Sequence, residues 1–204
     1  MLEEPVGLRE RKKLQRRRDI EATALELFEN DGFDGTTIES IAAAVGIAPR
    51  TFFYYFSTKE DVVLADYARR LERIVDEFAK RPDNESPWSS LRSSFLVVAA
   101  DYEAEREQLI RRFSIMATNP AVFARSLQLQ AGWEDALAAA LEERLSVGSH
   151  PVVGSRLLAS AALAAMRSSL NHWLATGFET PLPPLVEQCF DQLSIGLDSV
   201  GTVG

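Results

Sequence analysis

A short aromatic stretch near position 50 carries side chains that can bind the base edges and the phosphates of double-stranded DNA. Arg50 can donate two hydrogen bonds to a guanine, which discriminates between bases by about 1–3 kcal/mol. The hydroxyl groups of Tyr54, Tyr55 and Thr37 can donate to phosphate oxygens. Lys59 stands in the first turn of a further expected helix, where its ammonium group and backbone N–H groups can hold one phosphate together.

The same stretch must also supply a packing face. Phe52 and Phe56 are four residues apart, so on a helix we expect both to point inward with Ile41 and Val45. Core packing does not explain the three consecutive aromatic residues that begin at Phe53, because three neighbours cannot all face one side of a helix. The positions expected to be outward or flanking are Pro49, Arg50, Thr51, Phe53, Tyr54 and Tyr55.

Three predicted helices position these residues. Apolar residues from Ile20 to Phe28 have helical spacing, and Asp31-Gly32 ends that first helix. The second begins at Thr36 or Thr37, where Thr36 and Glu39 have the spacing of a capping box.

The second helix is expected to end at Gly46 in a left-handed turn. Pro49 suits the first position of the third helix, which extends to Phe56. Two short helices joined by a tight turn and preceded by a packing helix describe a helix-turn-helix, whose second helix lies in the major groove.

The rest of the chain is also predicted to be helical. Ser57 with Glu60 forms a second expected capping box, at the start of a fourth helix with a long apolar stripe. Five more helices follow a loop before Pro87. The prediction is an all-α fold of about nine helices, with a DNA-binding domain over 1–60 and a helical domain over 61–204. The last five helices are expected at about 87–98, 106–118, 120–145, 151–176 and 185–199, with prolines breaking the chain before the last.

Charge is distributed unevenly. The chain of 204 residues has a net charge of −8, but seven cations and one anion lie between Arg9 and Arg18. From Glu60 onward, 13 cations stand against 20 anions. A basic arm on an acidic body predicts that one end meets phosphate, and Arg16, Arg17 and Arg18 are candidate contacts. A solvated, disordered tail is the alternative explanation of this charge.

Residues 16–65 resemble the N-terminal domain of TetR-type transcriptional regulators, through the segment Gly32–Ile38, the turn Val45-Gly46-Ile47 and the segment Thr51–Asp61. The resemblance implies phosphate contacts at Thr37, Phe53, Tyr54, Tyr55 and Lys59, and base reading at Pro49, Arg50 and Thr51. Two positions depart from the family. Ala48 stands where Ser or Thr is frequent, and Phe53 stands where Tyr is frequent, so a cap and a hydroxyl contact are missing.

The same resemblance implies that the remaining helices form a dimerising, ligand-binding domain. The last two long helices, one of them rich in small residues, can pair with their symmetry mates into a four-helix bundle of a homodimer, although packing within one chain is the alternative. About residues 88–176 also resemble the C-terminal domains of actinobacterial TetR-type regulators, which include the mycofactocin-type regulators. The resemblance rests on Arg111-Arg112-Phe113, the segment 117–121, Trp133, the run 137–141 with Arg144-Leu145, and the alanine-rich helix that ends near Trp173. It implies an acyl-coenzyme A or related lipophilic effector.

An effector pocket should be mostly apolar with a few polar anchors, although each of these side chains taken alone more often belongs to the core or to a solvated face. The candidate lining and anchoring residues are Phe95, Arg112, Phe113, Met116, Phe123, Trp133, Leu163, Met166, Arg167, Leu170, Asn171 and His172. The function expected from these features is a repressor that binds a palindromic operator and is released by its effector.

Other functions find less support in the sequence. An enzyme would need an unusual acid–base site, because there are two histidines and one cysteine and no phosphate-binding glycine loop or metal-spaced cluster. No cofactor is therefore expected. A protein-interaction module without a DNA role would not explain the basic arm. The single Cys189 excludes an internal disulfide, and neither a signal peptide nor a membrane span is visible, so a cytoplasmic location is expected.

Overall fold

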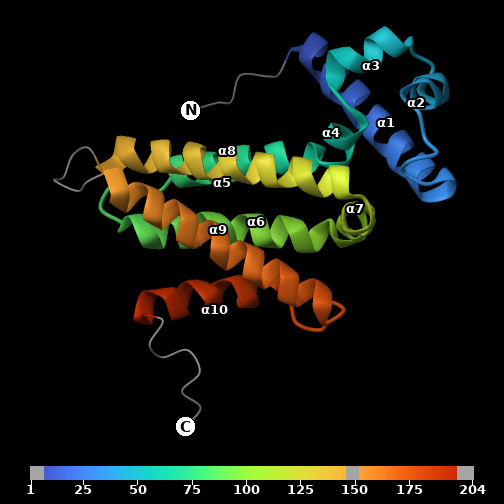
Figure 1. The fold of residues 1–204 in the computed structure, drawn as a ribbon. Coiled ribbons are helices and arrows are strands. Elements are labelled where there is room, and N and C mark those ends of the chain that lie inside the picture. The colour runs from blue at the N-terminus through green and yellow to red at the C-terminus, as the bar shows by residue number, and fades with distance from the viewer. Residues whose placement is uncertain (1–6, 146–151, 197–204) are drawn as a thin grey trace. The chain divides into compact units, whose positions relative to one another are not determined.

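The computed structural model describes residues 7–145 and 152–196, and this part of the chain folds into ten helices without strands (Figure 1). The predicted all-α class is confirmed. The helices are α1 (Leu8–Asp31), α2 (Ile38–Val45), α3 (Pro49–Tyr55), α4 (Lys59–Val63), α5 (Ala65–Ala79), α6 (Pro87–Ala104), α7 (Arg106–Thr118), α8 (Pro120–Leu145), α9 (Val152–Ala175) and α10 (Leu182–Ile195). None of these helices is long and apolar enough to cross a bilayer.

The chain forms two compact units. The first contains residues up to Asp66 together with Glu107–Leu127, and the second contains Tyr67–Arg106 and the residues from Gln128 onward. The predicted domain boundary lies after residue 60. The packing of α7 and the first turns of α8 with the N-terminal helices was not predicted, because it depends on contacts between residues distant in sequence.

The core of the first unit forms where α1 meets α2 and α3. Ile20 and Ala24 of α1, Ile41 of α2 and Phe52 of α3 have no exposed surface, as the apolar spacing predicted. Gly46 ends α2 with φ of 72°, a left-handed conformation that glycine adopts without a Cβ clash. The tight turn of the helix-turn-helix therefore forms where it was predicted.

Both predicted capping boxes are wrong by one residue. Thr37, not Thr36, caps α2, and its hydroxyl accepts from the Ser40 amide at 3.1 Å while Ser40 accepts from the Thr37 amide. Thr36 is instead buried, and its hydroxyl donates to the Gly32 carbonyl at 2.8 Å. This hydroxyl anchors the turn after α1 and is unavailable as a cap.

The second box fails in the same way, because Thr58 and not Ser57 caps α4 by accepting from the Asp61 amide at 3.1 Å. The expected fourth helix is also divided. It is interrupted at Leu64, the C-cap of α4, so the described chain has ten helices and not nine.

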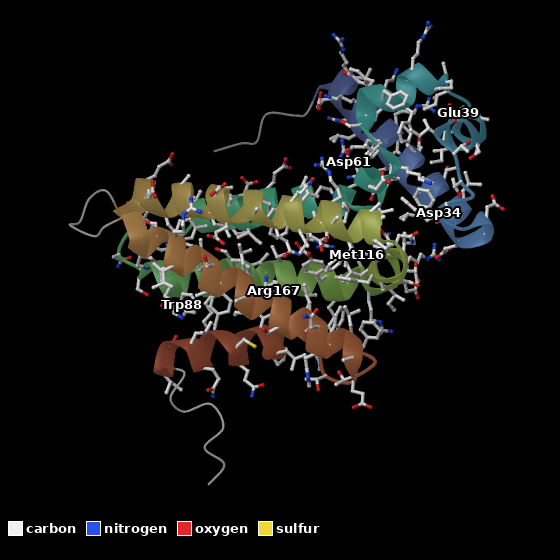
Figure 2. The ribbon with its side chains drawn as sticks, in the orientation of Figure 1. Asp34, Glu39, Asp61, Trp88, Met116 and Arg167 are labelled. Atoms are coloured by element: carbon white, nitrogen blue, oxygen red, sulfur yellow. The ribbon has the colours of Figure 1, made fainter. Side chains whose placement is uncertain are left out.

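The second unit is built from long helices, with α10 packed on α6 and α9. The Phe190 ring of α10 lies 4.7 Å from the Trp88 ring and 5.6 Å from the Phe95 ring, both on α6. Figure 2 shows Trp88 at the start of α6. The Trp88 indole N–H donates to the Ser194 hydroxyl at 2.7 Å and joins the same two helices.

The start of α10 differs from the prediction. Pro183 and Pro184 were expected to end the preceding segment, but α10 begins before them, at Leu182. Both prolines occupy the first turn, where a helix needs no backbone N–H donor. The predicted end of this helix, at residue 199, lies outside the described residues.

Candidate nucleic-acid interface

Helix α3 presents the predicted contact residues to solvent. Phe52 is fully buried, whereas 55% of Phe53 and 66% of Tyr54 are exposed. Pro49 and Arg50 are exposed at the start of the helix, and Thr51 and Tyr55 are half-buried on its flanks. The structure therefore brings Pro49, Arg50, Thr51, Phe53, Tyr54 and Tyr55 together on one short helix, with a free guanidinium-bearing end and an aromatic outer face.

Thr37 lies at the start of α2 and is exposed. Its hydroxyl oxygen accepts from the Ser40 amide, which uses one acceptor position and leaves the hydroxyl proton available for a further donation. Sequence reasoning missed Ser40 as the reciprocal partner. The signal was present, because Thr37 and Ser40 have the required spacing of three residues.

Lys59, which was predicted to contact phosphate, makes contacts within the first unit. Its ammonium group donates to the carbonyls of Phe33 at 2.7 Å and Thr36 at 3.2 Å, and lies 4.3 Å from the centre of the Phe33 ring. These bonds tie the start of α4 to the turn between α1 and α2. In this geometry Lys59 stabilises the orientation of the helix-turn-helix.

The three consecutive arginines of α1 point in different directions. The Arg17 guanidinium donates to the Tyr55 carbonyl at 3.1 Å and lies 4.4 Å from the centre of the Phe56 ring, so it joins α1 to the end of α3. Arg16 and Arg18 are exposed. The basic arm is helical from Leu8 onward and continuous with the rest of α1.

Arg112, predicted as a ligand anchor, is 7% exposed and is held inside the first unit. Its guanidinium group pairs with Glu21 of α1 and donates to the carbonyls of Val62 at 3.0 Å and Val63 at 2.6 Å. The last carbonyls of a helix lack intrahelical donors, and Arg112 satisfies two of them at the end of α4. The contacts of Arg112 in this structure are thus structural.

The other predicted ligand residues do not converge on one site. Phe113 and Met116 lie half-buried on α7 in the first unit, whereas Phe95 and Trp133 are buried in the second. Trp133 packs against Tyr67 with ring centres 5.6 Å apart. On α9, Met166 is buried, Leu170 is half-buried, and Arg167 and Asn171 are exposed. Figure 2 shows Arg167 on α9 and Met116 on α7.

Sequence reasoning also missed Trp173 of α9. This side chain is fully buried, with its ring edge-to-face with Phe178 at 4.7 Å, and its indole N–H has no hydrogen-bond partner among the described residues. A buried donor without an acceptor is destabilising by about 1–3 kcal/mol. A ligand oxygen would remove that cost.

A groove of about 450 Å³ lies between α9 and α10. Small side chains of α9 line one wall, and the cysteine thiol accepts a hydrogen bond from Ser169 at 3.3 Å. The lining residues are Ala164, Ala165, Ser168, Ser169, His172, Leu185, Gln188, Cys189, Gln192 and Leu193. Of the predicted ligand residues, His172 lines this groove and the other eleven do not.

Two family models match the chain. The model described as "Bacterial regulatory proteins, tetR family" matches residues 20–65, and the model described as "MftR C-terminal domain" matches residues 85–198. The second match alone covers more than half of the chain.

Curated relatives and solved structures agree with these matches. The transcriptional regulator TcmR of Streptomyces glaucescens is 29% identical over 90% of this chain and 88% of its own. MftR of Mycobacterium tuberculosis, whose name assigns it to the regulation of mycofactocin biosynthesis, is 27% identical over 88% and 89%.

Among solved structures, a TetR-family protein of Syntrophomonas wolfei has a TM-score of 0.65 at 23% identity, covering 93% of this chain and 100% of its own. FadR of Thermus thermophilus, solved with lauroyl-CoA, has a TM-score of 0.59 at 24% identity, covering 89% and 94%. At these identities the structures establish a shared fold.

Proposed function

The chain belongs to the TetR family of bacterial transcriptional regulators, and from this premise we propose that it is a repressor that binds a palindromic operator as a homodimer and leaves it when a small lipophilic effector binds. The observation that carries the DNA-binding part is the exposed face of α3. Arg50, Phe53 and Tyr54 face solvent, while buried Phe52 and the Arg17 bond to the Tyr55 carbonyl fix the helix beneath them.

Dimerisation is supported by the groove between α9 and α10. Small side chains such as Ala164 and Ser168 allow close approach of helices from a second copy, which yields a four-helix bundle. A two-fold dimer presents two recognition helices to half-sites about 34–36 Å apart, or a multiple of that distance.

An acyl-coenzyme A is the effector class we propose. The MftR-type C-terminal match and the solved complex of the Thermus thermophilus relative with lauroyl-CoA support this class. The indole N–H of Trp173, which has no hydrogen-bond partner in the described part of the chain, offers a donor for a thioester carbonyl. An effector that prefers another helix arrangement shifts the population away from DNA, and a shift from 1:99 to 99:1 needs about 5.5 kcal/mol of differential affinity.

The DNA-binding proposal is tested by fluorescence anisotropy with the duplex upstream of the chain's own coding region, an unrelated duplex as control, and several salt concentrations. Tight, salt-sensitive binding above the control is the expected result. Arg50→Ala should reduce the preference for the operator over the unrelated duplex by about 1–3 kcal/mol. Tyr54→Phe should lower the affinity for both duplexes by a similar factor. Identical behaviour of the two variants would contradict the assigned roles.

The effector proposal uses the same complex. Lauroyl-CoA should release the DNA, and coenzyme A alone should not. Trp173→Phe should need several-fold more lauroyl-CoA, because the carbonyl loses a donor worth about 0.5–1.5 kcal/mol. Trp88→Phe is the matched control, since the Trp88 indole already bonds Ser194. An unchanged complex at saturating lauroyl-CoA would exclude this acyl-coenzyme A as effector.

A further inference from the structure

One face of α1 changes its chemistry along the helix. Residues advance by about 100° per position on an α-helix, so Arg9, Lys12, Lys13 and Arg16 form a stripe about 100° wide. The same stripe continues into Ile20, which is fully buried in the core of the first unit. The face that packs against the helix-turn-helix is therefore cationic in its first turns.

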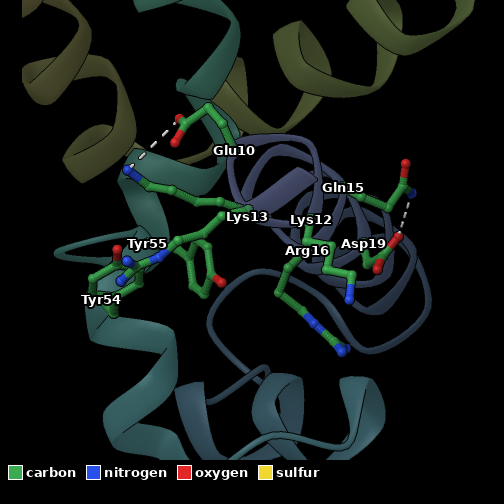
Figure 3. A pocket seen from close by; sticks show the side chains of 9 residues that line it. Glu10, Lys12, Lys13, Gln15, Arg16, Asp19, Tyr54 and Tyr55 are labelled. Carbon is green, nitrogen blue, oxygen red and sulfur yellow. Dashed lines mark hydrogen bonds and ion pairs between the residues drawn. The ribbon is translucent and has the colours of Figure 1, made fainter. Parts of the chain in front are cut away.

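This cationic stripe lines a groove of about 850 Å³ with the tyrosines of α3 (Figure 3). The lining residues are Arg9, Glu10, Lys12, Lys13, Gln15, Arg16, Asp19, Tyr54 and Tyr55. We call this surface the basic groove. It brings four cations beside the aromatic side chains of the recognition helix.

Two carboxylates in the basic groove already have partners. Asp19 accepts from the Gln15 amide at 2.8 Å, and Glu10 lies 4.0 Å from the Lys13 ammonium group. Lys13 also lies 5.8 Å from the centre of the Tyr54 ring. Lys12 and Arg16 project along the same wall (Figure 3), and both are exposed. The groove thus keeps a positive excess on an otherwise acidic chain.

We propose that the basic groove binds the phosphate backbone of the DNA duplex beside the site read by α3. This inference rests on the proposed DNA-binding function and extends it to residues that precede the TetR-family match, which begins at residue 20. The eight residues from Arg9 to Arg16 span roughly 10 Å along the helix, because the rise is about 1.5 Å for each step from one residue to the next. Successive phosphates of one DNA strand are about 3.4 Å apart along the duplex axis. A stripe of this length therefore faces roughly three phosphates.

Charge complementarity selects this occupant. Tyr54 lies both on the exposed face of α3 and in the basic groove, so a duplex held by α3 has its backbone next to the cationic stripe. Lysine and arginine contacts to phosphate add affinity without base preference. The groove should therefore strengthen binding to every sequence and leave the preference for the operator unchanged.

The test measures the salt dependence of binding with the full-length chain and two duplexes of about 30 base pairs, one selected by the wild-type chain from a random library and one of unrelated sequence. Lys12→Gln combined with Lys13→Gln should reduce the slope of log affinity against log salt by roughly 0.9 for each lost phosphate contact, on both duplexes. The ratio of the two affinities should stay constant.

Lys80→Gln combined with Arg167→Gln is the matched control. It removes the same charge from exposed positions of the second unit and should change the slope less. Equal slopes for the two double variants would overturn the proposal that the basic groove binds phosphate, because the salt dependence would then follow only the net charge of the chain. Failure of the wild-type chain to select any duplex would instead contradict the proposed function itself. Circular dichroism checks that every variant is folded.

Discussion

The two units each use an arginine to join helices, but in opposite surroundings. In the first unit, Arg112 of α7 is buried and binds Glu21 and the carbonyls that end α4. In the second unit, Arg92 of α6 stays partly exposed and donates to Asp191 of α10 at 3.2 Å and to Glu187.

The difference follows from the short helices that Arg112 supports, although α1, with 24 residues, also belongs to the first unit. Helices α2, α3 and α4 have 8, 7 and 5 residues, so each offers little apolar area. A buried guanidinium group adds directional bonds to helix-end carbonyls that packing does not satisfy. The second unit has helices of up to 24 residues entirely within it and is held by apolar contacts such as Trp88 and Phe95 on Phe190. The ion pairs of Arg92 with α10 are therefore partly exposed, although Arg70 of α5 in the same unit is buried and pairs with Glu105 at 2.8 Å.

The largest expected effect is on stability. Arg112→Met removes the buried guanidinium that pairs with the Glu21 carboxylate, and we expect a loss of about 3–5 kcal/mol of unfolding free energy. Arg92→Met should lose about 1 kcal/mol or less, because water solvates the carboxylates that remain. Urea denaturation followed by circular dichroism measures both.

Replacement of both partners sharpens this comparison. Glu21→Met added to Arg112→Met should recover much of the lost stability, since an apolar pair of similar volume needs no desolvated charge. Equal losses in Arg112→Met and Arg92→Met, without recovery in the double variant, would show that the two arginines are energetically equivalent.

The next effect concerns the small-residue wall of the second unit. Ser168→Arg puts an exposed cation into the groove between α9 and α10. Like charges that meet across a two-fold interface cost several kcal/mol, so the dimer dissociation constant should rise by roughly a hundredfold. Analytical ultracentrifugation measures it. Thr180→Arg, in the exposed turn before α10, is the control, and a dimer that survives Ser168→Arg would place the interface elsewhere.

The smallest effect tests a surface ion pair of the second unit. Hydrogen bonds from Arg81, at 2.6 and 2.7 Å, are the main reason that the pKa of Glu85 falls from 4.5 to about 2. A lowered pKa in the folded state stabilises the protein above the unfolded pKa, and this contribution is lost as the pH falls from about 4.5 to 2.

Glu85→Gln should therefore flatten the decline of the urea midpoint between pH 5 and roughly pH 2, by a small amount that added salt reduces. Glu142→Gln, an exposed carboxyl on α8, is the control. If the urea midpoint fell more steeply with pH in Glu85→Gln than in the wild-type chain, the Arg81–Glu85 pair would not stabilise the protein in this pH range.

The helix-turn-helix could be predicted because its sequence signals are local. Gly46, Pro49 and the spacing of Phe52 and Phe56 each determine the backbone or the face of one short segment. The cap of α2 was misplaced by one residue because Thr36 and Thr37 have the same side chain. The contact of Thr36 with the Gly32 carbonyl selects Thr37 as the cap.

The cationic side of the basic groove could also be predicted from the spacing of its residues in the sequence. The spacing of Arg9, Lys12, Lys13 and Arg16 places them on one face of a helix. They form this face only because α1 extends back to Leu8. Apolar spacing begins only at Ile20, so it carried no signal for these first turns.

The sequence by itself determined the all-α class, the family of the N-terminal segment and the exposed face of α3, because these depend on intervals of three to seven residues. Only the tertiary structure decided the contacts of Arg112, whose partners lie 49, 50 and 91 positions away. An arginine on an amphipathic helix has the same local pattern whether it meets a ligand, water or a buried carboxylate. Its surroundings are created by helices that the chain brings together only when it folds.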